Sequence, residues 1–253
     1  MSVQEEFAAV AREDGRAALV TVVRGQHLGE KMLFLLDGSS AGTLGDPDLD
    51  AEAREGAEDL MWAERSELRG DLFIDVTNPD PRVVIFGAVE FAAHLSALAR
   101  IAGWRPYVVD PRARFATPER FPEALDVVAA WPEEAFERLG PPDRATYIVI
   151  LTHDPKLDDA TLLVALRSDA PYIGAMGSKR AQADRRERLL AADVTEEEMA
   201  RISAPVGLDL GSKGARETAL AIMAELVAVR YGRAGGRLSD AKGGSIHSAA
   251  AKV

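Results

Sequence analysis

The order of apolar and polar residues divides the chain into two regions with different patterns. In residues 1–77, two segments repeat apolar positions at helical spacing, EEFAAVARE (5–13) and DLDAEAREGAEDLMWAERSE (48–67). The runs AALVTVV (17–23), KMLFLL (31–36) and DLFIDV (71–76) are strand-like, and DGSS supplies a turn between strands. This mixture predicts a small N-terminal α+β domain. TNPDPR (77–82) contains two prolines, which disfavour helix and sheet alike, so we expect a linker at 78–82.

Residues 83–232 show a different pattern, in which apolar strand-like runs alternate with helical segments. The predicted strands are VVIFGA (83–88), RPYVVD (105–110), LDVVAAW (125–131), TYIVILTH (146–153), APYIGAMGS (170–178) and APVGLDLG (204–211). Continuous apolar strands with helical crossovers favour a parallel sheet covered on both faces, so we expect an α/β, Rossmann-like, doubly wound domain. Residues 233–253 are rich in glycine, serine and alanine, and we expect a flexible tail.

Charge and composition narrow the classes of function. The 253 residues carry a formal net charge of -11, which argues against nucleic acid and anionic membranes as partners. The chain has no cysteine, so disulfides, thiolate metal sites and cysteine nucleophiles are excluded. No apolar run approaches the roughly 20 residues that span a bilayer, and the N-terminal segment is acidic and amphipathic. A soluble, cytoplasmic protein is therefore expected.

The first strand of the second region ends in a glycine turn that departs from the dinucleotide-binding pattern G-x-G-x-x-G. Gly87 and Ala92 suit the first and third glycine positions, but Val89 occupies the second, where the main chain would approach a pyrophosphate. Glu90 adds a negative charge at a helix N-terminus that otherwise attracts anions. The turn is therefore either a ligand site formed by Gly87 and Ala88 or a helix start that binds no ligand.

Asp110 ends the second strand about 20 residues further on. An acid at this place contacts a ribose hydroxyl in dinucleotide sites. The alternative is a strand-ending turn, because aspartate before proline is common in turns. The partial glycine pattern and Asp110 together support an alternative function as a nicotinamide-dependent oxidoreductase with NAD or NADP.

The segment YIGAMGSKR (172–180) combines a strand end with small, hydroxyl and basic residues. Gly174, Gly177, Ser178, Lys179 and Arg180 bring exposed amides, a hydroxyl group and two cations to a helix start, which suits a phosphate or pterin ligand. The alternative is a serine cap followed by a solvated basic turn.

Polar residues also follow the strand 146–153. Thr152, His153 and Asp154 lie where a central strand ends, the side on which ligands gather in such sheets. In the alternative interpretation Asp154 caps the next helix and His153 packs on the sheet. A metal site from His153, Asp158 and Asp159 is a further alternative, although neither spacing guarantees that the side chains converge.

Asp209 and Gly211 follow the last predicted strand. A glycine in such a loop permits an unusual backbone angle or a close approach by a ligand. Turn geometry alone explains the same residues, and both interpretations stay open.

Four longer segments carry a family resemblance. RVVIFGAVEFAAHL, VVDPRARFATPERFP, VILTHDPKLDDATLLVALRSDAPYIGAMGSKR and ISAPVGLDLGSKGARETALAIMAELVAVRYG resemble the Rossmann domain of the XdhC/CoxI family. ALVTVVRG and EKMLFLLDGSSAGTLGD resemble the small first domain of that family more loosely. The resemblance covers about 230 residues, all but the tail.

The resemblance implies an accessory protein, or chaperone, for molybdoenzymes of the xanthine-dehydrogenase or CO-dehydrogenase type. Such a protein is expected to hold the molybdopterin cofactor, to assist its sulfuration with a cysteine desulfurase and to pass it to the apo-molybdoenzyme client. The resemblance also favours Thr152, His153 and Asp154 as ligand-site residues. A homodimer is expected only from the frequency of symmetric dimers among such domains.

The chain departs from the family at two places. Family members commonly read G-A-G-H at the glycine turn, where this chain has Val89 and Glu90 in the last two positions. Many also carry a Gly-Gly-Cys or Gly-Gly-Gly stretch followed by a glutamate in the first domain, where this chain has Gly45, Asp46, Pro47 and Asp48. Transfer of sulfur through a thiol of this chain is therefore excluded. Beside the accessory protein and the nicotinamide-dependent oxidoreductase, a third hypothesis is a Rossmann scaffold that has lost its ligand.

Overall fold

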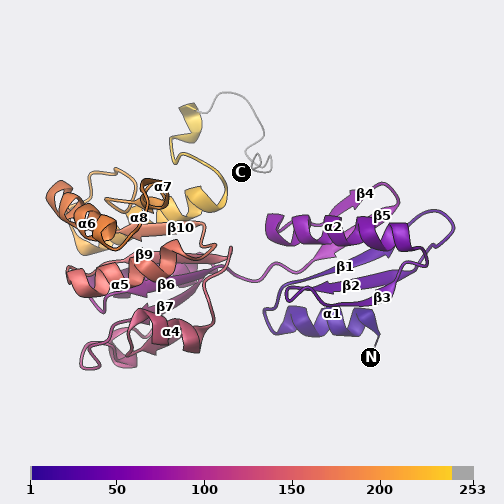
Figure 1. Cartoon of the computed structure of the whole chain (residues 1–253), viewed down its shortest axis with the longest axis horizontal. Coiled ribbons are helices and arrows are strands. Elements are labelled where there is room, and N and C mark those ends of the chain that lie inside the picture. The colour runs from indigo at the N-terminus through magenta and orange to yellow at the C-terminus, as the bar shows by residue number, and fades with distance from the viewer. Residues whose placement is uncertain (1, 241–253) are drawn as a thin grey trace. The chain divides into compact units, whose positions relative to one another are not determined.

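The computed structural model describes residues 2–240, which form two compact units divided between Asp80 and Pro81 (Figure 1). The predicted linker 78–82 includes this division. Of the predicted tail, residues 233–240 are described, and there Gly235 lies against the side chain of Leu208. Residues 241–253, which include His247, lie outside the described part of the chain.

The first unit is an antiparallel sheet with one helix on each face, as Figure 1 shows. The strand order is β3-β2-β1-β5-β4. The helices are α1 (Val3–Arg12) and α2 (Pro47–Ala63), and the strands are β1 (Ala17–Val22), β2 (Lys31–Leu35), β3 (Ser40–Thr43), β4 (Glu67–Arg69) and β5 (Leu72–Val76).

Both faces of strand β1 are buried, which explains its unbroken apolar sequence. Ala18, Val20 and Val22 belong to the core under α2, whereas Ala17 and Leu19 belong to the core under α1. This alternation follows from the two-residue period of a strand. Strands β3 and β4 were not predicted, because both are short and neither contains a buried residue.

The second unit contains a six-stranded parallel sheet, which confirms the predicted Rossmann-like fold. The strand order is β11-β10-β9-β6-β7-β8. The strands are β6 (Arg82–Phe86), β7 (Arg105–Val109), β8 (Asp126–Val128), β9 (Thr146–Ile150), β10 (Tyr172–Ala175) and β11 (Ile202–Ser203). The helices are α3 (Glu90–Ile101), α4 (Pro132–Leu139), α5 (Pro155–Leu166), α6 (Lys179–Ala191), α7 (Glu196–Met199) and α8 (Ala215–Arg230), with single 3-10 turns η1 (Pro118–Arg120) and η2 (Leu238–Asp240).

Helices cover both faces of this sheet. Leu95 of α3 and Ile222 of α8 share one core with the side chains on one face of the strands. Phe136 of α4, Leu162 of α5 and Leu189 of α6 share the other core with the opposite face. Within residues 2–240, the longest apolar stretch of any helix falls short of what crossing a membrane requires.

The last predicted strand is wrong. Residues 204–211 form a loop, and the sheet ends earlier along the chain with the two-residue strand β11. Pro205 cannot donate a ladder hydrogen bond, and Gly207 and Gly211 adopt φ values of +101° and +70°, which a strand does not use. Asp209 and Gly211 therefore lie in the long loop before α8.

Candidate ligand-binding edge of the Rossmann unit

The carboxyl ends of the parallel strands meet at one edge of the sheet, and backbone hydrogen bonds join the loops that leave them. The amide of Leu151 donates to the carbonyl of Phe86, and the amide of Met176 donates to that of Ile150. Strands β6 and β9 are neighbours, but the helices that follow them, α3 and α5, pack on opposite faces. Ligands of open α/β sheets bind at this type of switch point.

Gly87 is required at this switch point for two reasons. Its φ of +110° is unfavourable for residues with a side chain, and a Cβ atom would lie 3.0 Å from the backbone nitrogen of Thr152. The turn after β6 thus packs directly on the end of β9. Val89 is the N-cap residue of α3, makes no side-chain capping bond and packs against the core.

Asp110 is fully buried and is occupied by groups of the protein itself. Its carboxylate accepts hydrogen bonds from the amide of Ala88 at 2.9 Å and from the amide of Arg112 at 3.0 Å. The guanidinium of Arg112 adds two more, from Nε at 2.8 Å and Nη2 at 2.7 Å. Asp110 was expected to contact a ribose hydroxyl. In the structure its carboxylate instead links the glycine turn to the end of β7.

This set of donors determines the ionisation of Asp110. Burial alone would raise the pKa of the carboxyl group, but the hydrogen bonds from Arg112 and from the amide of Ala88 outweigh burial and lower the pKa below its ordinary value of 3.8. Asp110 is thus a structural anion that holds two loops together.

The residues after β9 adopt the capping arrangement. The Oδ1 atom of Asp154 accepts the amide of Lys156 at 3.0 Å, and the hydroxyl of Thr152 accepts the amide of Asp154 at 2.8 Å. His153 is exposed, so it does not pack on the sheet. Capping leaves the side chain of His153 at the solvent side of the edge, available for contact with a ligand.

The alternative metal site at this loop is not formed. Asp158 is bound to Arg185, and Asp159 accepts two hydrogen bonds from Arg188, at 2.6 and 3.0 Å. Between residues 2 and 240, no three or more His, Asp or Glu side chains gather in a way that would hold a metal ion.

The predicted anion site after β10 divides into a buried and an exposed part. Gly174 lies inside β10, where a Cβ atom would lie 2.6 Å from both the Tyr172 ring and Val206, so its role is packing. Ser178 is the N-cap of α6 and accepts the amide of Ala181.

Lys179 and Arg180 lie in the exposed first turn of α6. No hydrogen bond or ion pair joins either side chain to another described residue. The turn before them contains Gly177, whose φ is +145°.

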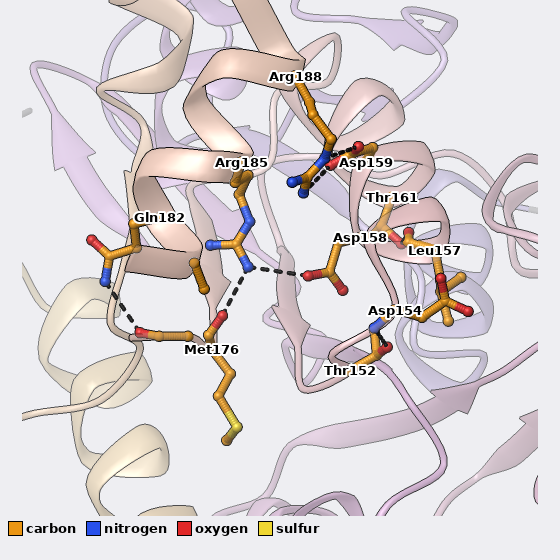
Figure 2. A network of polar contacts seen from close by, with 12 residues as sticks. Thr152, Asp154, Leu157, Asp158, Asp159, Thr161, Met176, Gln182, Arg185 and Arg188 are labelled. Atoms are coloured by element: carbon orange, nitrogen blue, oxygen red, sulfur yellow. Dashed lines mark hydrogen bonds and ion pairs between the residues drawn. The ribbon is translucent and has the colours of Figure 1, made fainter. Parts of the chain in front are cut away.

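A buried ion pair lies behind this turn (Figure 2). Arg185 of α6 donates from Nη2 to Oδ2 of Asp158 at 3.1 Å and to the carbonyl of Met176 at 2.8 Å. Arg185 is 4% exposed and Asp158 is 5% exposed. Three buried atoms lack a hydrogen-bond partner among the described residues, namely Oδ1 of Asp158 and Nε and Nη1 of Arg185. Gly177 covers this guanidinium, since a Cβ atom there would lie 3.8 Å from Nη1.

Burial has a clear effect on Asp158. It raises the pKa of this carboxyl group above 3.8, and the hydrogen bond and charge of Arg185 offset only part of the rise. Both partners of this pair are thus incompletely satisfied, and the pair lies directly behind the turn that contains Gly177.

The loop after β11 is held by a second network, which is partly buried. The hydroxyl of Tyr172 donates to Oε2 of Glu225 on α8, and the same oxygen accepts the amide of Gly207 at 2.6 Å. Burial and the neighbouring carboxylate raise the pKa of Tyr172 far above its ordinary value. Asp209 and Gly211 are exposed, and no Cβ contact restricts Gly211.

Sequence reasoning missed Arg112, Arg185 and Glu225, which organise the loops at this edge. Arg112 lies two residues after Asp110, a spacing that allows a side chain to return to the preceding carboxylate. Arg185 lies in a helix rich in charged residues, so the sequence gives no signal that this side chain faces inward, whereas Glu225 is the single charge within a long apolar stretch of helix α8.

The fold defines a Rossmann-type protein in which α6 begins with an exposed basic turn, and comparison with known families gives its relationship. The family profile described as XdhC Rossmann domain matches residues 83–226, and the profile described as XdhC and CoxI family matches residues 10–70. The chain belongs to the XdhC and CoxI family.

Individual relatives agree with this placement. A protein of Bacillus subtilis named as a probable subunit of xanthine dehydrogenase is 31% identical over 162 residues, which are 63% of this chain and 46% of that protein. The molybdenum cofactor insertion chaperone PaoD from Escherichia coli is 26% identical over 152 residues, 60% of this chain and 41% of PaoD. The chain therefore spans less than half the length of these relatives.

A solved structure shows the same fold. The crystal structure of a protein described as a xanthine dehydrogenase from Bacillus halodurans matches with a TM-score of 0.62 and 23% identity, over 89% of this chain and 65% of that chain. The nicotinamide-dependent alternative gains no support from these relatives, and the buried, occupied Asp110 does not favour it.

Proposed function

We propose that this protein is a molybdenum cofactor carrier that binds molybdopterin at the edge described above and delivers it to an apo-molybdoenzyme of the xanthine-dehydrogenase type. The observation that carries the proposal is the exposed basic start of α6, which lies in a Rossmann unit related in sequence to a molybdenum cofactor insertion chaperone. Molybdopterin carries a phosphate group, and that group is the part of the cargo this edge would hold.

The residues present fit a phosphate. The first amides of an α-helix lack acceptors within the helix, and the helix dipole favours an anion there. Lys179 and Arg180 oppose that dipole when no anion is bound. A bound phosphate would remove this conflict. His153 is exposed at the end of the adjacent strand β9 and is the proposed contact for the pterin, whereas Thr152 is buried and its hydroxyl accepts the amide of Asp154.

The chain offers no thiol, so a sulfur atom cannot be relayed through a cysteine of this protein. In the proposed function the cysteine desulfurase acts on the carried cofactor while this protein holds it. A homodimer stays a prediction. The rival hypothesis of a scaffold without a ligand predicts no binding at the same edge, and one experiment separates the two.

That experiment measures transfer of cofactor. The protein is mixed with molybdenum cofactor released from a molybdoenzyme, freed of unbound cofactor by gel filtration and added to apo-xanthine dehydrogenase. We expect the enzyme to regain activity, and we expect the double variant Lys179→Glu/Arg180→Glu to transfer at least about tenfold less because two charge-assisted contacts are reversed. Arg100→Glu, an exposed arginine at the far end of α3, is the matched control. No transfer by the wild type, or equal transfer by the double variant, would contradict the proposal.

A further inference from the structure

An apolar groove of about 450 Å³ lies beside α8. Part of its lining comes from α8 and its C-cap residue, namely Leu220, Ala224, Val227 and Tyr231. The rest includes Leu208 of the loop after β11 and Gly235, which lies against the side chain of Leu208. Single exposed apolar side chains are common on protein surfaces, but a contiguous apolar groove is typical of a binding site.

The lining residues of α8 form one stripe along the helix. Leu220, Ala224, Val227 and Tyr231 follow one another at intervals of four, three and four residues. This spacing places side chains on one face and recurs in the seams between packed helices. Leu220 is 51% exposed and Tyr231 is 54% exposed, whereas Ile222 is fully buried in the core. Beside its core face, α8 therefore presents a second apolar face whose spacing suits another helix.

Arginines flank this groove, although the chain has a net charge of -11. Among the described residues of the lining, Arg233 has the one charged side chain. The guanidinium carbon of Arg230 lies 5.5 Å from the centroid of the Tyr231 ring, and the exposed Arg216 lies one helical turn before Leu220.

The two glutamates of α8 are engaged elsewhere. Oε2 of Glu225 accepts the hydroxyl of Tyr172 and the amide of Gly207, so this carboxylate is turned toward β10. Oε2 of Glu217 accepts the amide of Lys213 at 3.0 Å, at the N-terminal end of α8. A partner with acidic residues therefore meets arginines at this groove.

An amphipathic helix with acidic residues beside its apolar stripe fits these features. Such helices bind apolar grooves through residues one helical turn apart, and complementary charges at the rim select the partner. A second copy docked by the same face would bring its own arginines against Arg230 and Arg233. The net charge of -11 repels an anionic membrane.

The groove begins beside the ligand-binding edge. The amide of Val206 donates to the carbonyl of Ala175 at the end of β10, at 3.1 Å, and Leu208 of the lining follows two residues later. The amide of Leu208 donates to the carbonyl of Ala221 at 3.1 Å, which holds this loop on α8. A protein docked in the groove therefore lies next to the edge that holds the cofactor in the proposed function.

We propose that this groove is a docking site for an amphipathic helix of the apo-molybdoenzyme, with acidic residues beside the apolar stripe of that helix. The inference deepens the proposed function and rests on it, because it names the surface on which the recipient of the cofactor docks. Leu220 and Tyr231 are the apolar contacts for the helix, and Arg216, Arg230 and Arg233 bind its acidic residues.

The test measures binding of the full chain to apo-xanthine dehydrogenase by isothermal titration, before any cofactor is added. We expect Leu220→Asp to weaken binding at least about tenfold, because it replaces an apolar contact by a charge that repels an acidic partner. Arg216→Glu should weaken binding at least about threefold. Ile101→Asp is the matched control, since Ile101 of α3 is 84% exposed and lies outside the groove lining, and it should leave the affinity unchanged.

Two synthetic peptides test the chemistry of the partner. One forms an amphipathic helix with leucines at intervals of four, three and four residues and glutamates beside them, and the other has lysines in place of the glutamates. We expect the glutamate peptide to compete with the enzyme for the groove and the lysine peptide not to compete. Equal competition by the two peptides, equal affinity of Leu220→Asp and the wild type, or no binding of the enzyme would overturn the inference.

Other occupants of the groove give different results, and each of these would also overturn the inference. Self-association that Leu220→Asp abolishes would assign the groove to a second copy of the chain. Binding to phosphatidylserine vesicles that depends on Leu220 would assign it to a membrane. Faster hydrogen exchange of residues 241–253 in Leu220→Asp would assign it to that segment of the same chain.

Failure of the proposed function is a separate result. If the protein retains pterin and Leu220→Asp delivers it as well as the wild type does, only the docking inference fails. If the protein retains no pterin but binds the enzyme through Leu220, only the proposed function fails.

Discussion

Replacement of Arg185 by methionine tests the buried ion pair behind the α6 turn. Methionine keeps most of the length of the side chain but leaves Asp158, which is 5% exposed, without its cationic partner. Breaking a buried pair by removing one partner typically costs about 3–5 kcal/mol. The carboxylate can escape part of this cost by taking up a proton, because burial already raises its pKa.

The cost of that protonation sets both the size and the pH dependence of the effect. A carboxyl group with an ordinary pKa of 3.8 costs about 4 kcal/mol to neutralise at pH 7 and about 2 kcal/mol at pH 5. In the variant, the folded state binds a proton that the unfolded state does not, so its stability falls as pH rises. We expect a loss of about 4 kcal/mol at pH 7 that shrinks to about 2 kcal/mol at pH 5.

Hydrogen exchange of the β9 amides is the suitable assay, because it reports on the second unit alone in a chain that has two units. Arg188→Met is the matched control, since Arg188 pairs with Asp159 on the same two helices but is 36% exposed, and it should cost less than about 1 kcal/mol. A loss below about 1 kcal/mol for Arg185→Met at pH 7, or a loss that does not change between pH 5 and pH 7, would show that Arg185 does not stabilise a buried Asp158 carboxylate.

Three further substitutions test other contacts of the edge. Gly87→Ala should lower the free energy of unfolding in urea by at least about 2 kcal/mol, because it combines a positive φ with a backbone contact at 3.0 Å. Gly236→Ala is the control and should change the urea midpoint little, because a Cβ atom there meets no atom within 4 Å. The lowered pKa of Asp110 means that the ionised carboxylate stabilises the fold above its ordinary pKa of 3.8, and this stabilisation is lost on acidification. The difference in stability between the wild type and Asp110→Asn should therefore shrink from pH 7 to pH 3. A constant difference would contradict this role of the carboxylate. Tyr172→Phe should cost about 1–2 kcal/mol and speed hydrogen exchange at Gly207, the other donor to Glu225; an unchanged exchange rate there would show that the phenol does not hold the loop.

The sheet of the second unit could be predicted from sequence because its strands are buried on both faces. Val83 to Phe86 and Tyr147 to Ile150 form unbroken apolar runs, and such runs have few alternatives when helical segments separate them. The glycine turn at Gly87 was predictable for a different reason, because a positive φ favours glycine and so marks the turn in the sequence. Strand β11 was misplaced because its two residues carry almost no pattern.

The state of the candidate site was less predictable, because it depends on which polar side chains turn toward each other. Asp110 looks the same in sequence whether it faces a ribose or Arg112, and only the fold shows that its oxygens are occupied. Arg185 lies in KRAQADRRERLLA, a helix that resembles a solvated surface helix, although this one arginine is buried. Long-range pairing of charges, such as Arg185 with Asp158, leaves no periodic signal.

The most direct measurement of the central claim is the amount of pterin that stays bound to the protein after gel filtration, quantified by the fluorescence of its oxidised form. We expect close to one pterin per chain for the wild type and for Arg100→Glu, and a loss of most of it for Lys179→Glu/Arg180→Glu. A wild-type protein that retains no pterin, or a double variant that retains as much as the wild type, would contradict the claim that this edge holds the molybdenum cofactor.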